Sequence, residues 1–262
     1  MNASPRKVSV LAVLILATCA VRADVLYEAD AGTNQVREYT APLTYSVFAN
    51  VTYQTGLALY GGSLFVATAT GEILQFTAPN TYTVFASGLS FPRAIDCDPQ
   101  GDVFVVNGST EPGQILKFTA ANTYTVFGTG PATFGGILAL GPNNVYVTDD
   151  TPTGAVWHFT APNTGAIIQS GSFNYPTGII NYGGLLVASQ PAYAYAVDNS
   201  GNLYEADWTN GHGASGVILE NGASYATGLT IPTDIVVSPQ AIVPEPGTAL
   251  FGLALCGFSV GS

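Results

Sequence analysis

One short phrase occurs four times in the body of this chain. It is an aromatic residue followed by Thr-Ala-Pro or Thr-Ala-Ala, and the aromatic residues lie 37, 42 and 41 positions apart, at Tyr39, Phe76, Phe118 and Phe159. A second, apolar phrase lies ahead of each copy and returns once more, with starts at Leu26, Leu64, Val103, Val145 and Leu203. Units of roughly 40 residues bury a core only by packing against one another.

Strand-like alternation of apolar and polar residues runs through these units, as in Tyr124-Thr125-Val126-Phe127, and no segment shows an extended helical period. The chain is 47% hydrophobic and only 9% charged, which excludes a disordered chain. A repeat near 40 residues built of short strands predicts an all-β fold, a β-propeller. The order of phrases, a Pro-x-Gly-Ile run, an Asp/Gly turn and a Leu-Tyr-Val-Ala-Asp run, resembles NHL-type propellers and their six-bladed relatives over most of residues 26–239.

Two irregularities predict how the ring is built. The phrase at Leu185 is followed after only 18 positions by the next copy at Leu203, so the blade that begins at Pro176 lacks most of its outer hairpin. Residues 231–239 form an inner strand with no partner after it, and residues 26–30 open a blade with no inner strand before it. We expect these two ends to pair, which closes the ring and removes its exposed edges. The count is six blades with one stunted, or five if the stunted blade merges with its neighbour.

The N-terminus carries an export signal. Arg6 and Lys7 precede an apolar run over residues 8–21, and Val21-Arg22-Ala23 predicts cleavage before Asp24. A lipoprotein signal at Cys19 is the less favoured alternative, because Thr18 is a poor residue just before a lipidated cysteine. Residues 1–23 are therefore expected to be a signal peptide and residues 24–240 the propeller domain.

Cleavage leaves three basic residues against 17 acidic ones, a formal charge of 3 − 17 = −14. This balance excludes a nucleic acid as an electrostatic partner, because such binding needs Lys and Arg to neutralise phosphates.

The C-terminus carries a second targeting signal. Pro244-Glu245-Pro246 is followed by an apolar run from Thr248 to Val260. Residues 241–262 resemble the PEP-CTERM sorting signal of exported bacterial proteins, but no basic residue follows the apolar run. The resemblance implies a bacterial cell-envelope, cell-surface or extracellular-matrix location, contact with the membrane through this segment, and processing by an exosortase-type enzyme.

Residues with metal-binding or catalytic chemistry are few. The two histidines, His158 and His212, are 54 positions apart, and no zinc spacing or nucleophile motif occurs. Asp96, Asp98 and Asp102 form an acidic loop whose alternating carboxylates could hold Ca²⁺, but the loop lacks the length and final Glu of a calcium-binding EF-hand. We interpret these aspartates as turn residues and expect no cofactor, with Ca²⁺ as the alternative. Asp149 and Asp150, which end a strand, are likewise expected to cap it.

Lactonase-type six-bladed relatives carry a metal in the central channel, held by an acid and amides of different inner strands. In this chain the inner strands are apolar or rich in glycine, and only Arg93 and Asp234 stand out as candidates for the channel rim. No set of residues matches the metal ligands of those relatives.

Two functions fit this sequence. The scarcity of convergent polar residues favours an exported, non-enzymatic module that binds a polysaccharide or protein outside the cell. The alternative is a metal-dependent hydrolase or lyase of the six-bladed, lactonase-like superfamily.

Overall fold

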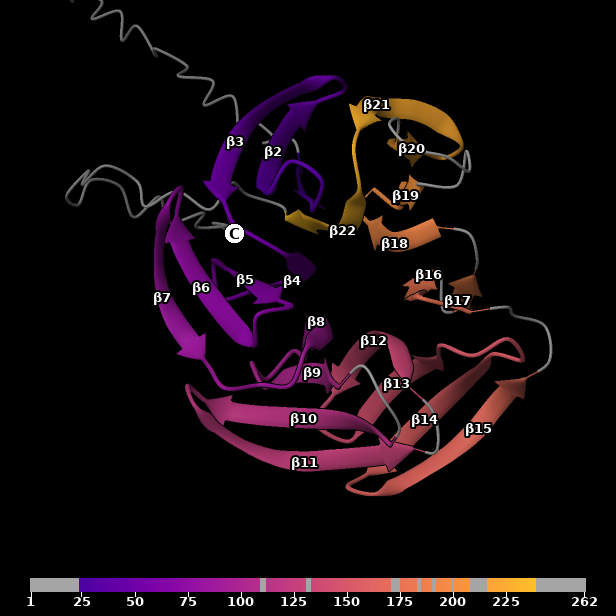
Figure 1. Ribbon diagram of the computed structural model, residues 1–262. Coiled ribbons are helices and arrows are strands. Elements are labelled where there is room, and N and C mark those ends of the chain that lie inside the picture. The colour runs from indigo at the N-terminus through magenta and orange to yellow at the C-terminus, as the bar shows by residue number, and fades with distance from the viewer. Residues whose placement is uncertain are drawn as a thin grey trace, which may run out of the picture.

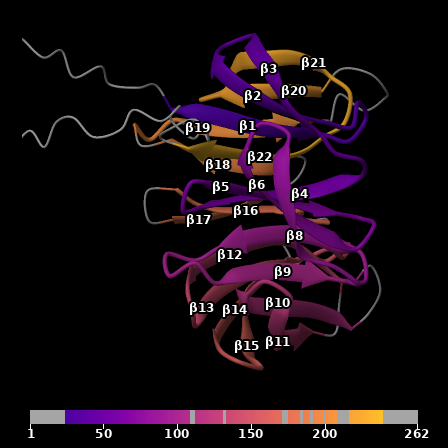
Figure 2. The same ribbon diagram turned by 90° about the vertical axis from the view of Figure 1, so that its left-hand side faces the viewer.

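The computed structural model describes residues 24–108, 112–130, 133–170, 175–182, 185–189, 192–198, 200–207 and 216–238. The predicted signal peptide and sorting segment lie outside these residues. Within them the chain forms 22 strands and no helix, so no described helix could span a membrane. The strands form a ring of sheets around a central axis (Figure 1), and from the side the molecule is a thick disc (Figure 2).

The strands group into six antiparallel sheets, here called blades I to VI and given with the innermost strand first. Blade I is β22 (Pro232–Ser238), β1 (Val25–Asp30), β2 (Gln35–Ala41) and β3 (Thr44–Asn50). Blade II is β4 (Gln54–Tyr60), β5 (Ser63–Thr68), β6 (Glu72–Ala78) and β7 (Thr81–Ala86). Blade III is β8 (Pro92–Cys97), β9 (Val103–Asn107), β10 (Gly113–Ala120) and β11 (Thr123–Gly130). Blade IV is β12 (Phe134–Gly141), β13 (Asn144–Asp149), β14 (Ala155–Ala161) and β15 (Thr164–Ser170). Blade V is β16 (Gly178–Tyr182) and β17 (Leu185–Ser189), and blade VI is β18 (Ala192–Val197), β19 (Leu203–Asp207), β20 (Gly216–Glu220) and β21 (Ala223–Leu229).

The repeated phrase forms the outer hairpin of a blade and ties that blade to the one before it. Asn80, Asn122 and Asn163 follow the phrase at the hairpin tip with φ near +55°, a conformation that Asn tolerates better than most residues. Their backbone N–H groups donate to Phe48, Phe85 and Phe127 of the preceding blade, with N···O distances of 3.1, 2.9 and 2.7 Å. The repeat therefore encodes both a turn and a contact between blades.

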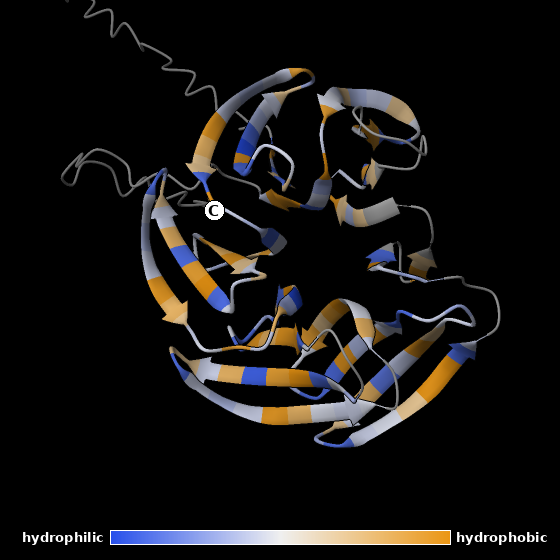
Figure 3. Cartoon of the chain, in the orientation of Figure 1, coloured by the Kyte–Doolittle hydropathy of each residue, from blue (hydrophilic) through white to orange (hydrophobic). Residues whose placement is uncertain are grey.

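The core lies between the blades and is built from the same phrases. Phe48, Phe85 and Phe127 of one blade pack on the repeated aromatic residue of the next, with ring centroids 5.8, 5.8 and 6.4 Å apart. Hydrophilic and hydrophobic bands follow one another along β10 (Figure 3), whose buried side chains pack into the core.

Both predicted irregularities are confirmed. β22 pairs with β1, so the C-terminal strand completes the N-terminal blade. At this closure Asp30 accepts backbone N–H bonds from Thr230 and Ile231, at 3.0 and 2.9 Å, and pairs with the Arg37 guanidinium at 2.9 Å. In the described residues blade V has two strands where each of the other blades has four.

Candidate functional site

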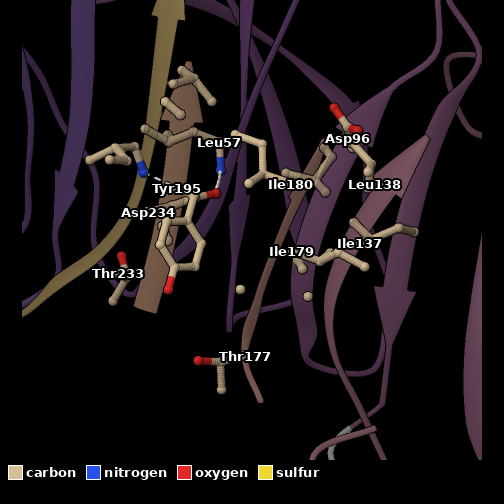
Figure 4. Close-up of a pocket in the computed structure, with 18 of the residues that line it drawn as sticks. Leu57, Asp96, Ile137, Leu138, Thr177, Ile179, Ile180, Tyr195, Thr233 and Asp234 are labelled. Carbon is tan, nitrogen blue, oxygen red and sulfur yellow. Dashed lines mark hydrogen bonds between the residues drawn. The ribbon is translucent and has the colours of Figure 1, made fainter. Parts of the chain in front are cut away.

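The six inner strands enclose a central cavity of about 470 Å³ (Figure 4). Equivalent positions of neighbouring inner strands lie side by side, because Thr233 and Thr55 donate hydroxyl bonds to the carbonyls of Gln54 and Pro92, at 3.4 and 2.7 Å. Neighbouring inner strands are therefore parallel, and residues that precede them lie at one end of the channel, here called the mouth. Most of the cavity wall is apolar, with side chains such as Leu57, Ile137 and Ile179.

Small residues let neighbouring inner strands approach closely. A Cβ atom on Gly136 would lie 2.4 Å from the carbonyl oxygen of Thr177, and one on Gly56 would lie 3.2 Å from the backbone of Ala94. Asp234 occupies the same position in β22, and its side chain reaches the neighbouring strand instead.

Asp234 joins two inner strands through its carboxylate. One oxygen, Oδ2, accepts the backbone N–H of Leu57 in β4 at 2.6 Å, and Oδ1 accepts that of Ile235 at 2.9 Å. Burial raises the pKa of Asp234 to about 7, against the lowering effect of these two bonds, and the charge of Asp96 raises it further.

Asp96 repeats this geometry further along the channel. Its Oδ2 accepts the backbone N–H of Ala139 in β12 at 2.7 Å, and Oδ1 accepts that of Cys97 at 2.8 Å. Burial raises the pKa of Asp96 to about 7, and the nearby charge of Asp98 adds to the effect. The cavity thus brings together two carboxyl groups, Asp96 and Asp234, that we had assigned to different sites.

Arg93 lies in the cavity wall but is already paired. Its guanidinium Nη2 lies 2.5 Å from Oδ2 of Asp150, and 25% of the Arg93 side chain and 16% of the Asp150 side chain are exposed. The pair connects blade III with blade IV. Arg93 occupies the position in its inner strand that Thr55 and Thr233 occupy in theirs, and those two residues likewise bond to the next blade. Both predicted rim residues, Arg93 and Asp234, thus line the cavity, and each is bonded to a neighbouring blade.

The acidic loop does not gather its three aspartates around one point. Asp98 Oδ1 accepts the backbone N–H groups of Gln100 and Asp102, both at 2.9 Å, in the turn between β8 and β9. Asp102 pairs with Lys117 at 2.8 Å. Asp96 belongs to β8 and faces the channel, so the prediction of a turn residue was wrong for Asp96 alone.

The metal implied by the resemblance to lactonase-type propellers does not fit the donors found here. Asp96 and Asp234 lie on different blades and each uses both oxygens to accept backbone N–H groups, and no other Asp, Glu or His side chain of the described residues lines the cavity. Among the described residues, no three His, Cys, Asp or Glu side chains gather as a metal site. The absence of a cofactor stays a prediction.

The histidines do not add to the cavity. His158 stacks on Tyr146 with ring centroids 4.1 Å apart and shares a 2.8 Å hydrogen bond with Asn144. His212 lies outside the described residues.

Tyr195 is a cavity residue that our sequence reasoning missed. It lies in β18 where the other five inner strands carry Leu or Ile, at Leu57, Ile95, Ile137, Ile179 and Ile235. In Figure 4 its hydroxyl points along the channel toward the end where Thr177 and Thr233 lie. Aligning the repeats would have revealed Tyr195, because it is the one polar residue at a position where the other five inner strands are apolar.

No protein-family profile matches this chain, and no curated protein matches it by sequence. Solved structures do match it in fold. A gluconolactonase from Xanthomonas campestris is 11% identical, with a TM-score of 0.55 over 78% of this chain and 82% of that one. A catalytically inactive virginiamycin B lyase from Staphylococcus aureus, in complex with quinupristin, is 12% identical, with a TM-score of 0.50 over 77% of this chain and 85% of that one. The extracellular domain of a putative hybrid two-component system from B. thetaiotaomicron is 12% identical, with a TM-score of 0.50 over 70% of this chain and 30% of that one.

These likenesses define the chain as a β-propeller with gluconolactonase-like structural neighbours. They also correct our expectation of a non-enzymatic protein, because a gluconolactonase and a lyase share its fold. That expectation rested on the scarcity of polar residues in the inner strands; it took Asp96 for a turn residue and did not consider Tyr195. The comparison favours the hydrolase or lyase alternative at the level of the fold.

Proposed function

We propose that this protein is a hydrolase of small esters or lactones, with its active site in the central channel. The observation that carries the proposal is the presence of two carboxyl groups, Asp96 and Asp234, each with its pKa raised to about 7, in one 470 Å³ cavity. Perturbed carboxyl groups in a largely apolar cleft are typical of acid–base catalysts. The fold shared with a gluconolactonase supports a cyclic ester as substrate.

The chemistry follows from the two protonation states. With both pKa values near 7, the ionised and neutral forms of each carboxyl group coexist near pH 7, so part of the protein holds one group ionised and the other neutral. The ionised group takes a proton from water as the water oxygen bonds to the ester carbonyl carbon. The neutral group gives its proton to the leaving oxygen as the C–O bond breaks.

The backbone bonds of the two aspartates set their positions for this chemistry. Each carboxylate oxygen accepts one N–H from its own strand or the next, and a second lone pair on each oxygen stays available for a substrate or water. Because the donors belong to parallel inner strands, neither side chain can turn away from the channel without losing two hydrogen bonds.

Hydrolysis assays on a panel of lactones and aryl esters test the proposal. We expect Asp96→Asn and Asp234→Asn each to lower kcat/KM by about a hundredfold or more, which is the usual scale for general acid–base catalysis. Asp102→Asn is the matched control, because Asp102 pairs with Lys117 outside the cavity. Activity that survives in both channel variants would show that the two aspartates have another role.

A further inference from the structure

Three aromatic residues at the channel mouth have no role in the proposed chemistry. Tyr53, Phe91 and Tyr175 each lie two positions ahead of a residue in the cavity wall (Thr55, Arg93 and Thr177) in blades II, III and V. We call these three the mouth aromatics. Their side chains are 63%, 43% and 46% exposed, and of the three Phe91 is the one that lines the cavity.

The mouth aromatics hold an unfavourable backbone conformation. Their φ angles are +57°, +56° and +55°, in the left-handed region that bulky side chains rarely adopt. The conformation itself is structural, since the carbonyls of Tyr53 and Phe91 accept N–H bonds that close their blades, at 2.8 and 3.3 Å. Gly or Asn would serve that purpose with less strain. Strained residues of this kind cluster at sites of function, so the aromatic side chains themselves call for an explanation.

The charges inside the channel favour one sign of ligand. Arg93 is offset by Asp150 at 2.5 Å, so the lining holds no unbalanced positive charge among its described residues. Asp234 and Asp96 lie further along the inner strands than the mouth aromatics, and in their ionised forms they supply the negative charge of the lining. A narrow channel with apolar walls focuses this negative potential.

Aromatic faces and carboxylates attract the same kind of ligand. The π-electron face of Tyr or Phe attracts ammonium groups, and rings of this kind recognise quaternary amines in proteins. The same carboxylates would repel an anion. The apolar wall between mouth and carboxylates suits an alkyl portion.

We propose that the channel selects small organic cations, amines or quaternary ammonium compounds, which pass the mouth aromatics and place their charge beside Asp234 and Asp96. The inference names the substrate class of the proposed hydrolase and depends on that proposal only for turnover. The binding itself requires no catalysis.

Three ligands of nearly equal shape test the selection. Choline is cationic, 3,3-dimethylbutanol is its uncharged isostere, and 3,3-dimethylbutanoate carries a negative charge. Calorimetric titration of the full-length protein should show choline binding at least about tenfold more tightly than the alcohol, and the anion more weakly still. Equal affinities, a preference for the anion, or displacement of choline by millimolar Ca²⁺ would overturn the inference.

Asparagine substitutions separate the role of the rings from that of the backbone. Because Asn accommodates a positive φ, Tyr53→Asn, Phe91→Asn and Tyr175→Asn should leave the melting temperature unchanged or raise it, and together lower choline affinity severalfold. Tyr82→Asn, at a 52% exposed residue of the outer strand β7, should leave binding unchanged. Unchanged choline affinity in the triple variant would contradict a role for the mouth aromatics.

The two proposals fail separately. Preference for choline in a protein that hydrolyses no ester would overturn the hydrolase and leave the cation selectivity. Turnover of neutral esters that depends on Asp96 and Asp234, without any preference for choline, would support the hydrolase and overturn the cation selectivity.

Discussion

Single carboxyl groups determine much of this protein's electrostatics, and Glu28, like Asp30, is fully buried. Its side chain has no exposed surface, and it lies where blades II, III and IV carry Val66, Val105 and Val147 and blade VI carries Glu205. The Arg37 guanidinium lies 3.6 Å away, but burial outweighs it and raises the pKa of Glu28 to about 8. Glu28 is therefore mostly neutral at pH 7, like a large polar substitute for valine.

Raised carboxyl pKa values predict a fall in stability with rising pH. Between about pH 5 and pH 8 the native state holds protons on Glu28, Asp96 and Asp234 that the unfolded chain has lost. The free energy of unfolding should therefore drop across this range, because each proton that only the native state holds lowers it by about 1.4 kcal/mol per pH unit. Asp30, whose pKa is lowered, adds stability that disappears below about pH 4.

Guanidinium chloride unfolding at several pH values measures this slope. Glu28→Gln should make it shallower, because glutamine cannot ionise, with little cost in stability at pH 5. A free energy of unfolding that rises from pH 5 to pH 8 would contradict the predicted protonation states.

Residue position within a strand also decided what the sequence could predict. Asp96, Asp98 and Asp102 read as one acidic turn, but β8 continues through Cys97. Asp96 lies within β8 and bonds to Ala139 of the next inner strand, whereas Asp98 lies beyond the end of β8 and accepts the backbone N–H groups of the turn. The sequence pattern alone did not show whether the strand ends before Asp96 or after Cys97.

The strand and hairpin elements followed from the sequence because each repeat carries its own turn chemistry. Asn80, Asn122 and Asn163 specify the outer hairpins locally, so no long-range information was needed. The link from Asp234 to Leu57 joins residues 177 positions apart, and only the closed ring brings them together. The candidate site was therefore much less predictable than the blades.

The pairing of β1 with β22 should make Asp30 important for stability. Asp30→Ala should lower the free energy of unfolding by about 3 kcal/mol or more, because it frees the N–H groups of Thr230 and Ile231 and leaves Arg37 buried without its nearest partner. Asp198→Ala is the matched control, since Asp198 also accepts two backbone N–H bonds but in a turn between strands of one blade. We expect Asp198→Ala to lower the free energy of unfolding by less than half as much as Asp30→Ala. Equal losses for the two variants in denaturant unfolding would refute a special role for the closure.

The whole ring is uneven in strength, because blade V has two described strands. A blade without an outer hairpin buries less apolar surface, and Leu185 in β17 is 72% exposed. Hydrogen–deuterium exchange should therefore be fastest in β16 and β17 and slowest in β5 and β9, where every described side chain is buried. Uniform protection around the ring would show that blade V is as well supported as the others.

The ring also explains why two aspartates on separate blades form one site. Six parallel inner strands converge on one axis, so Asp96 of blade III and Asp234 of blade I share a cavity that neither blade forms alone. The hydrolase proposal depends above all on the raised pKa values of these two carboxyl groups.

Carboxyl-carbon NMR titration of the full-length protein measures that protonation without a substrate, with Asp96→Asn and Asp234→Asn used to assign the two signals. We expect two carboxyl groups that titrate near pH 7, and a lower pKa for Asp234 once Asp96→Asn removes the neighbouring charge. Apparent pKa values below about 5 for both groups, the ordinary range of an aspartate, would contradict this expectation.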